Sequence, residues 1–120
     1  MKHAFRFLIF LFFASCVVEN PYDEMIIGQW KGHEWFINHS TVKQKVDSIY
    51  FNFEQDSIYN ASYVGSKQEG KYWLRENRLY TQINDKLEVM VKISSLNADT
   101  MVFEMNRGGT PETLILTRQK

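Results

Sequence analysis

The chain carries few of the side chains that do chemistry in catalytic centres. It has 120 residues with one cysteine, Cys16, and three histidines. His33 and Glu34 are neighbours in an extended segment, where successive side chains point to opposite faces, so they do not converge on one substrate group. His33 and His39 lack the close spacing and the additional ligands of a zinc site. No G-x-S-x-G turn or phosphate-binding glycine loop occurs, so we predict no enzymatic activity, no metal and no cofactor.

The charge balance argues against a nucleic-acid partner. Lys plus Arg and Asp plus Glu both number 14, so the formal net charge is zero. Proteins that bind nucleic acid usually show a basic excess. Hydrophobic residues make up 44% and charged residues 23% of the chain, which is typical of a single globular domain. One cysteine excludes an internal disulfide.

The first residues have the composition of an export signal. Lys2 and Arg6 give a positive start, residues 7–13 form an unbroken apolar run, and two small residues follow. This order is typical of a secretory signal peptide, and the run is far shorter than the roughly 20 residues that span a bilayer. We predict that residues 1–15 are removed. The remaining chain has 12 basic and 14 acidic side chains, so its net charge is −2. This net charge gives the domain as a whole no electrostatic attraction to phosphate surfaces.

The cysteine stands directly after this signal. Phe13-Ala14-Ser15-Cys16 resembles the lipobox of bacterial lipoproteins, although leucine is the usual residue where Phe13 stands. The resemblance implies that Cys16 is lipidated and becomes the first mature residue, with residues 16–25 as lipidated cysteine and tether. Several acyl chains hold firmly, so we expect attachment to the bacterial cell envelope, at the outer membrane. The alternative is a buried free thiol.

Residues 26–120 are expected to form one β domain. Apolar residues alternate with polar ones at period two, which is the signature of half-buried strands. The clearest run places Leu87, Val89, Val91 and Ile93 on one face. Other runs cover residues 48–53, 59–63, 70–74, 78–83, 101–105 and 113–117. No amphipathic helical period of useful length follows residue 26.

Short turns separate these runs and set the fold class. Asn, Asp and Gly, which tolerate the positive φ of tight turns, stand between the strands, and Asn84-Asp85 is expected to form a two-residue hairpin. Connections this short join antiparallel neighbours. Eight such strands predict an all-β, antiparallel up-and-down eight-stranded barrel, because closure removes exposed sheet edges. A β-sandwich is the alternative.

Three residues carry a family resemblance. Gly28-x-Trp30 near the mature start resembles the motif that opens lipocalins, and Arg118 stands at the end of the last expected strand. The chain resembles the small lipocalin-like lipoproteins of bacterial envelopes over residues 26–118. The resemblance implies that Trp30 packs across the closed end of the barrel with Arg118 over its ring. A guanidinium on an indole face gains about 0.5–2 kcal/mol.

An eight-stranded barrel is either filled by side chains or holds one small ligand. Large side chains fall on the alternating faces, and they either pack the core outright or line a small apolar pocket near the open end. The candidate pocket residues are Phe51, Phe53, Tyr59, Tyr63, Tyr72, Phe103 and Met105. Which of them point inward depends on register, and a bulge at Gly32 would reverse the faces of the rest of its strand.

Two functions from different classes follow. The first is a membrane-anchored, non-enzymatic binder of a small apolar molecule. The second is an envelope protein–protein interaction module with a filled barrel, whose exposed aromatic side chains would be Trp35, Phe36, Trp73 and Tyr80.

Overall fold

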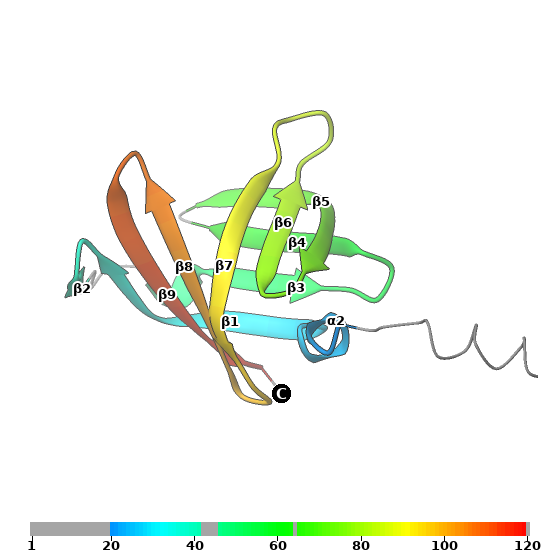
Figure 1. The fold of residues 1–120 in the computed structure, drawn as a ribbon, viewed down its shortest axis with the longest axis horizontal. Helices are drawn as coiled ribbons and strands as arrows, with labels where there is room; N and C mark the ends of the chain where they lie inside the picture. Colours follow the sequence, from blue (N-terminus) through cyan, green and yellow to red (C-terminus); the bar gives the residue numbers. More distant parts are fainter. Residues whose placement is uncertain (1–19, 42–45, 64, 120) are drawn as a thin grey trace, which may run out of the picture.

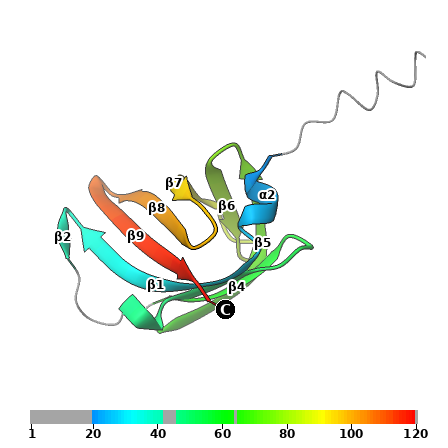
Figure 2. The ribbon, with the colours of Figure 1, turned by 90° about the horizontal axis from the view of Figure 1, so that it is seen from below.

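The β-sheet of this protein closes on itself. In the computed structural model, nine strands form one antiparallel sheet, and the first strand also pairs with the last. The closed wall contains eight strands, because β2 adds only a two-residue flap to the far half of β1 (Figures 1 and 2). The strands are β1 Gly28–Ile37, β2 Ser40–Thr41, β3 Tyr50–Phe53, β4 Ile58–Tyr63, β5 Ser66–Arg75, β6 Arg78–Gln82, β7 Val89–Leu96, β8 Thr100–Arg107 and β9 Thr110–Arg118. The predicted eight-stranded barrel is confirmed, and the β-sandwich alternative is wrong.

The structure describes residues 20–41, 46–63 and 65–119. The predicted signal peptide (1–15), Cys16 and the first part of the tether lie outside these residues. Among the residues that the structure describes, no helix is both long enough and apolar enough to cross a membrane.

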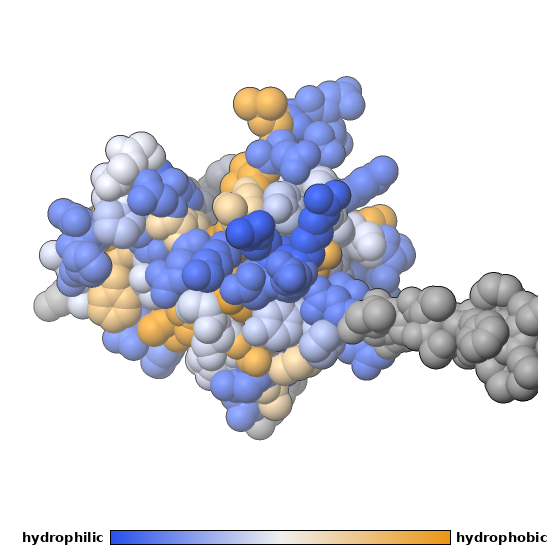
Figure 3. Space-filling model, in the orientation of Figure 1, coloured by the Kyte–Doolittle hydropathy of each residue, from blue (hydrophilic) through white to orange (hydrophobic). Residues whose placement is uncertain are grey.

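Strands that follow one another along the chain lie side by side in the closed wall, in the order β1-β3-β4-β5-β6-β7-β8-β9. Period-two alternation gives every strand an inner and an outer face. The inner side chains form the core, which includes Trp30, Phe53, Tyr59, Leu79 and Phe103, each at most 1% exposed. Polar side chains cover much of the outer surface seen in Figure 3.

The two ends of the barrel differ. One end, which we call the closed end, holds a short helix, α2 (Tyr22–Met25), together with the turns at residues 54–57, 76–77 and 97–99. The other end, which we call the open end, holds the loops at residues 83–88 and 108–109 and the β2 flap. Neighbouring strands run in opposite directions and pair in a defined register. Each residue of the barrel wall therefore lies at a defined depth between the two ends.

Residues 20–25 differ from the expected tether. Met25 and Tyr22 of α2 pack against the core, and the following Ile26 is fully buried. The amide of Asn20 donates to the carbonyl oxygen of Glu76 at 3.0 Å. The apolar residues of this segment close the bottom of the barrel, which a solvated tether would leave open.

A bulge interrupts β1. The pairing between β1 and β9 shifts register between Gly32 and Glu34, at the position where the sequence analysis considered the effect of a bulge. A Cβ at Gly32 would clash with the backbone carbonyl oxygen of Val46, so the close approach of the 3-10 helix η1 (Val46–Ser48) requires glycine. The bulge lets the far half of β1 leave β3 and bend toward β2.

The connection between β6 and β7 is longer than predicted. A tight turn does form at Asn84-Asp85, where the backbone N–H of Lys86 donates to the carbonyl of Ile83 at 2.9 Å. The ladder, however, resumes only where Thr81 pairs with Val89, so the expected two-residue hairpin is wrong. Leu87 is therefore 90% exposed at the open end, and does not share the buried environment of Val91 and Ile93.

Candidate functional site

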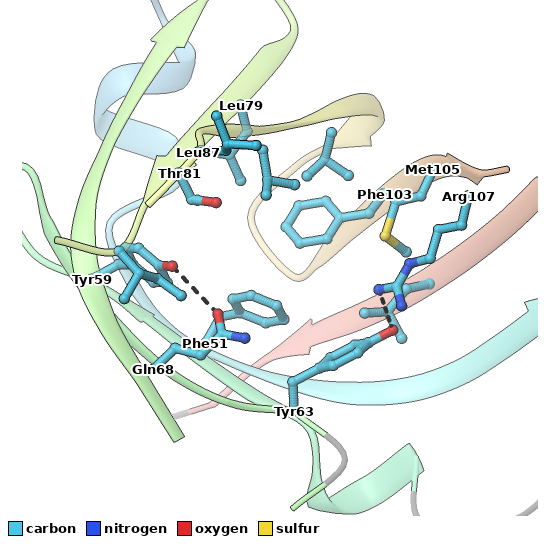
Figure 4. A pocket seen from close by; sticks show the side chains of 14 residues that line it. Phe51, Tyr59, Tyr63, Gln68, Leu79, Thr81, Leu87, Phe103, Met105 and Arg107 are labelled. Carbon is cyan, nitrogen blue, oxygen red and sulfur yellow. Dashed lines mark hydrogen bonds between the residues drawn. The ribbon is translucent and has the colours of Figure 1, made fainter. Parts of the chain in front are cut away.

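The interior of the barrel holds a cavity at its open end. Its volume is about 190 Å³, and inward-facing residues from β3 to β9 and the β6–β7 loop line it (Figure 4). The apolar part of the lining comprises Phe51, Leu79, Ile83, Leu87, Val89, Val91, Phe103, Met105 and Leu114. Polar atoms are few, and they come from Tyr59, Tyr63, Gln68, Thr81 and Arg107. Such a lining favours an apolar molecule that is oriented by a small number of hydrogen bonds.

One polar group lies on the wall formed by β4, β5 and β6. The side chains of Tyr59 and Gln68 meet there, with the phenol oxygen 3.4 Å from Oε1 of Gln68 (Figure 4). Burial raises the pKa of Tyr59 above its ordinary value of 10.0, and a hydrogen bond with Thr81 opposes that shift. The phenol therefore keeps its proton at neutral pH and can act as a hydrogen-bond donor inside the barrel.

A second polar group crosses the mouth. Nη2 of Arg107 donates to the phenol oxygen of Tyr63 at 2.9 Å, and the guanidinium lies 5.3 Å from the centre of that ring. Arg107 also pairs with Glu112 on β9, with Nε 3.4 Å from Oε2. Burial raises the pKa of Tyr63, the charge of Arg107 lowers it, and Glu112 raises it. Tyr63 therefore meets Arg107 as a neutral phenol.

Glu112 is the buried anchor of this group. Its side chain is only 7% exposed, whereas that of Arg107 is 56% exposed. The indole N–H of Trp35 donates to Oε1 of Glu112 at 3.1 Å. A buried carboxylate needs such partners, because desolvation of an unpaired charge is costly. Glu112 thus holds Arg107 in position at the mouth.

The closed end is sealed by one arginine. Arg118 lies over the ring of Trp30, with Cζ 4.3 Å from the ring centre. Its donors reach three backbone carbonyls of the end loops, those of Met25, Ile27 and Ala98, at 2.5, 2.8 and 2.6 Å. The indole N–H of Trp30 donates to the carbonyl of Ile26 at 2.9 Å. This network ties β9, β1 and the segment before β1 together and closes this end of the barrel.

Gly28 completes the closed end. Its φ is +132°, and a Cβ there would stand 2.6 Å from Nη1 of Arg118. A side chain at this position would displace the guanidinium. The structure thus brings Gly28, Trp30 and Arg118 together at the place that the sequence motif indicated.

The candidate pocket residues divide into two groups. The structure places Phe51, Tyr59, Tyr63, Phe103 and Met105 in the cavity lining. Phe53 and Tyr72 instead belong to the closed core beneath it, where their rings pack at 5.0 Å and the Tyr72 phenol donates to the carbonyl of Glu54 at 2.6 Å. Neither side chain is part of the cavity lining.

Sequence reasoning missed several lining residues. Gln68 and Thr81 fall on the inner face of β5 and β6. Thr81 lies within the expected run at residues 78–83, and the alternation of the run at residues 70–74 reaches Gln68 when it is extended by two residues. Arg107 carried no such signal, because it sits beside a glycine turn that resembles a solvated loop. Leu87 was expected in a strand and lies in the loop at the mouth.

The aromatic residues of the interaction hypothesis are half-buried, and none is fully exposed. Trp35 faces inward, with its ring 5.8 Å from that of Tyr63. Trp73 and Tyr80 stack on the outer face of β5 and β6 at 5.7 Å with nearly parallel planes. The four residues therefore do not form one surface.

The two histidines of the domain, His33 and His39, are exposed. Within residues 20–41, 46–63 and 65–119, no three His, Cys, Asp or Glu side chains come together in a group that could hold a metal ion.

A closed antiparallel meander with a Trp–Arg seal at one end and a cavity at the other defines a lipocalin-like barrel. The family model for the lipocalin-like domain matches residues 26–103, so the chain belongs to the lipocalin-like domain family. This confirms the family resemblance seen in the sequence, while the lipobox remains a prediction.

Two solved structures share the fold. One is an uncharacterized protein from Bacteroides eggerthii, with 18% identity and a TM-score of 0.58, covering 78% of this chain and 98% of that one. The other is a lipocalin-like protein from Bacteroides uniformis, with 18% identity and a TM-score of 0.57, covering 78% of this chain and 97% of that one. At this identity the similarity is one of fold. No curated protein matches the chain.

Proposed function

We propose that this chain is a membrane-anchored, non-enzymatic binding protein that holds a small apolar molecule, or the apolar end of a larger one, in its barrel. The observation that carries the proposal is the cavity of about 190 Å³ with apolar walls at the open end. An apolar cavity of about 150 Å³ accepts a benzene-sized molecule, whereas drug-sized ligands need about 300–1,000 Å³. A single ring or a short acyl segment therefore fits inside.

The polar groups would orient the occupant. Tyr59 and Gln68 offer a donor and an acceptor on one wall, and Arg107 stands at the mouth with its positive charge partly exposed. A ligand with an apolar body and one hydrogen-bonding group would use both features. Leu87 and Val89 would cover any part that protrudes, because they line the mouth while being 90% and 58% exposed.

The anchor belongs to the same proposal. A signal peptide over residues 1–15 and lipidation at Cys16 would attach the domain to the cell envelope, at the outer membrane. Incorporation of labelled palmitate, lost in Cys16→Ser, tests this part separately from ligand binding. Full incorporation into the Cys16→Ser variant would contradict it.

The binding proposal is tested by native mass spectrometry of the protein from its own host, followed by titration with any molecule that is released. Val91→Phe fills the cavity from its wall and is expected to abolish binding while the barrel stays folded. Val102→Phe is the matched control, because Val102 lies on the outer face of β8. A barrel that is consistently empty, or equal binding by both variants, would contradict the proposal.

A further inference from the structure

A row of basic side chains crosses the outer face of the barrel. Arg75 of β5 stands opposite Arg78 of β6, and Arg78 stands opposite Lys92 of β7. All three are exposed, as is Lys71 farther along β5. The structure gives the described residues one salt bridge, between Arg107 and Glu112, so none of these four charges is neutralised by an ion pair.

An apolar row runs directly beside it. Trp73 stands opposite Tyr80, and Tyr80 stands opposite Met90, which is 49% exposed. The guanidinium of Arg75 lies 5.9 Å from the centre of the Tyr80 ring and links the two rows. We call the two rows together, with Lys71, the basic face. In Figure 3, strongly hydrophilic side chains gather over the region of β6 and β7.

Most acidic side chains of this region stand at its margins. Glu69, Asp85 and Glu88 lie toward the open end, with Glu69 and Asp85 lining the same hollow as Lys71, and Glu76 lies in the β5–β6 turn. Glu104 stands opposite Lys92 at one end of the basic row, and its carboxylate oxygens accept hydrogen bonds from the uncharged hydroxyls of Ser94 at 3.2 Å and Thr113 at 2.8 Å. The row itself therefore holds three basic side chains against one acidic one, although the mature chain as a whole is slightly acidic.

The start of the described chain lies beside this face. The amide of Asn20 is bonded to the carbonyl of Glu76, between Arg75 and Arg78 in sequence, and α2 packs against β5. Three residues lie between Cys16 and Asn20, and the four residue steps from one to the other span at most about 14 Å when fully extended. A lipid held by Cys16 thus cannot lie far from the β5–β6 turn.

We propose that the anchored domain lies with the basic face on an anionic phospholipid surface. The inference rests on the anchor of the proposed function. Indole and phenol side chains favour the head-group region, and lysine and arginine are attracted to anionic head groups, so both rows suit this surface. The cavity mouth stays accessible from the aqueous side, because it lies at the other end of the strands from the tether.

The test is a lysine footprint on the intact protein. The full chain is expressed in a bacterium, extracted from its membranes and reconstituted on vesicles of phosphatidylcholine alone or of phosphatidylcholine with phosphatidylglycerol. Amine acetylation is then read at each lysine by mass spectrometry, which also shows whether Cys16 is acylated. Three basic side chains near an anionic surface favour the docked orientation by about 100-fold, so we expect strong protection of Lys92 and Lys71 on anionic vesicles at low salt. The protection should disappear on neutral vesicles and at high salt.

The controls use lysines away from the face. Lys86 lies in the loop of the open end and Lys31 lies on β1, so both should be labelled equally on the two kinds of vesicle. Arg75→Gln with Arg78→Gln should remove the protection of Lys92, whereas Lys31→Gln with Lys86→Gln, which changes the net charge equally, should leave it.

The outcomes separate the inference from the proposed function. Vesicle flotation with uniform labelling overturns the docking face and leaves the anchor standing. A failure to float on anionic vesicles overturns both the face and the anchor. Ligand binding in the cavity is measured independently and does not depend on either result.

Discussion

Arg107 and Tyr63 join opposite walls of the barrel across its mouth. Arg107 belongs to β8 and Tyr63 to β4, which stand four places apart in the closed order of eight strands, yet Nη2 lies 2.9 Å from the phenol oxygen. Glu112 holds the guanidinium from the β9 side. The Arg107–Tyr63 contact therefore crosses the mouth of the cavity, and a ligand that enters from the open end must pass beside it.

Removal of the Arg107–Tyr63 contact should change the rate of ligand exchange more than the stability of the fold. Tyr63→Phe deletes the hydroxyl and one exposed hydrogen bond, so we expect a loss of about 1 kcal/mol in the free energy of unfolding. The dissociation rate of a bound molecule should rise several-fold, because the mouth opens without breaking that bond. Stopped-flow displacement measures the rate, and Tyr50→Phe, on the outer face of β3, is the control. Equal dissociation rates in the two variants would contradict the proposed role of the Arg107–Tyr63 contact.

Loss of Arg118 should weaken the whole fold. Arg118→Met removes the donors to the carbonyls of Met25, Ile27 and Ala98 and the cation over Trp30. Unsatisfied carbonyls and the lost cation–π contact together predict a destabilisation of about 3 kcal/mol, measured by urea denaturation. Arg78→Lys, at an exposed site without an ion pair, should stay within about 0.5 kcal/mol of the parent. Similar losses for the two variants would show that the seal contributes nothing specific.

Gly28 should be coupled energetically to Arg118. Gly28→Ala forces a Cβ into the space of Nη1, whereas a Cβ at Gly65, which also has positive φ, meets nothing within 4 Å. We expect Gly28→Ala to cost more stability than Gly65→Ala. The excess should shrink when Arg118 is already Met, since the clash is then gone, and a double-mutant cycle measures this difference. If the effects of Gly28→Ala and Arg118→Met are strictly additive, the cost of Gly28→Ala comes from its backbone conformation alone and not from a clash with Arg118.

The buried phenols predict a loss of stability at alkaline pH. Burial is the main cause that raises the pKa of Tyr59, Tyr63 and Tyr72 above the ordinary value of 10.0. The unfolded chain then releases these protons at lower pH than the folded chain, so the stabilisation is fully present below pH 10 and falls as pH rises above it. Denaturation midpoints between pH 8 and pH 11, roughly the range around a phenol pKa, should show this fall. Tyr59→Phe should flatten it, and an equally steep fall in that variant would contradict the prediction.

Much of the fold was accessible from local pattern. Period-two alternation identified the inner faces of β3, β4, β8 and β9, because a strand sends successive side chains to opposite sides whatever its neighbours are. Short turns then required antiparallel neighbours, and a row of such strands with one apolar face favours closure. Gly28, Trp30 and Arg118 marked the sealed end in advance. The helix at Tyr22–Met25 was missed, since four residues give too little periodicity to detect.

Local alternation along the chain was enough to predict which side chains share a face of a strand, because successive residues of a strand point to opposite sides. The assembled barrel was needed to establish which of those faces continue past a bulge and which inward residues meet. The absence of Phe53 and Tyr72 from the cavity lining, and the contact of Arg107 with Tyr63 across the cavity, depend on how the strands are staggered in the closed barrel. The basic face likewise arises only when Arg75, Arg78 and Lys92 are brought into register, which a net charge summed along the chain cannot show.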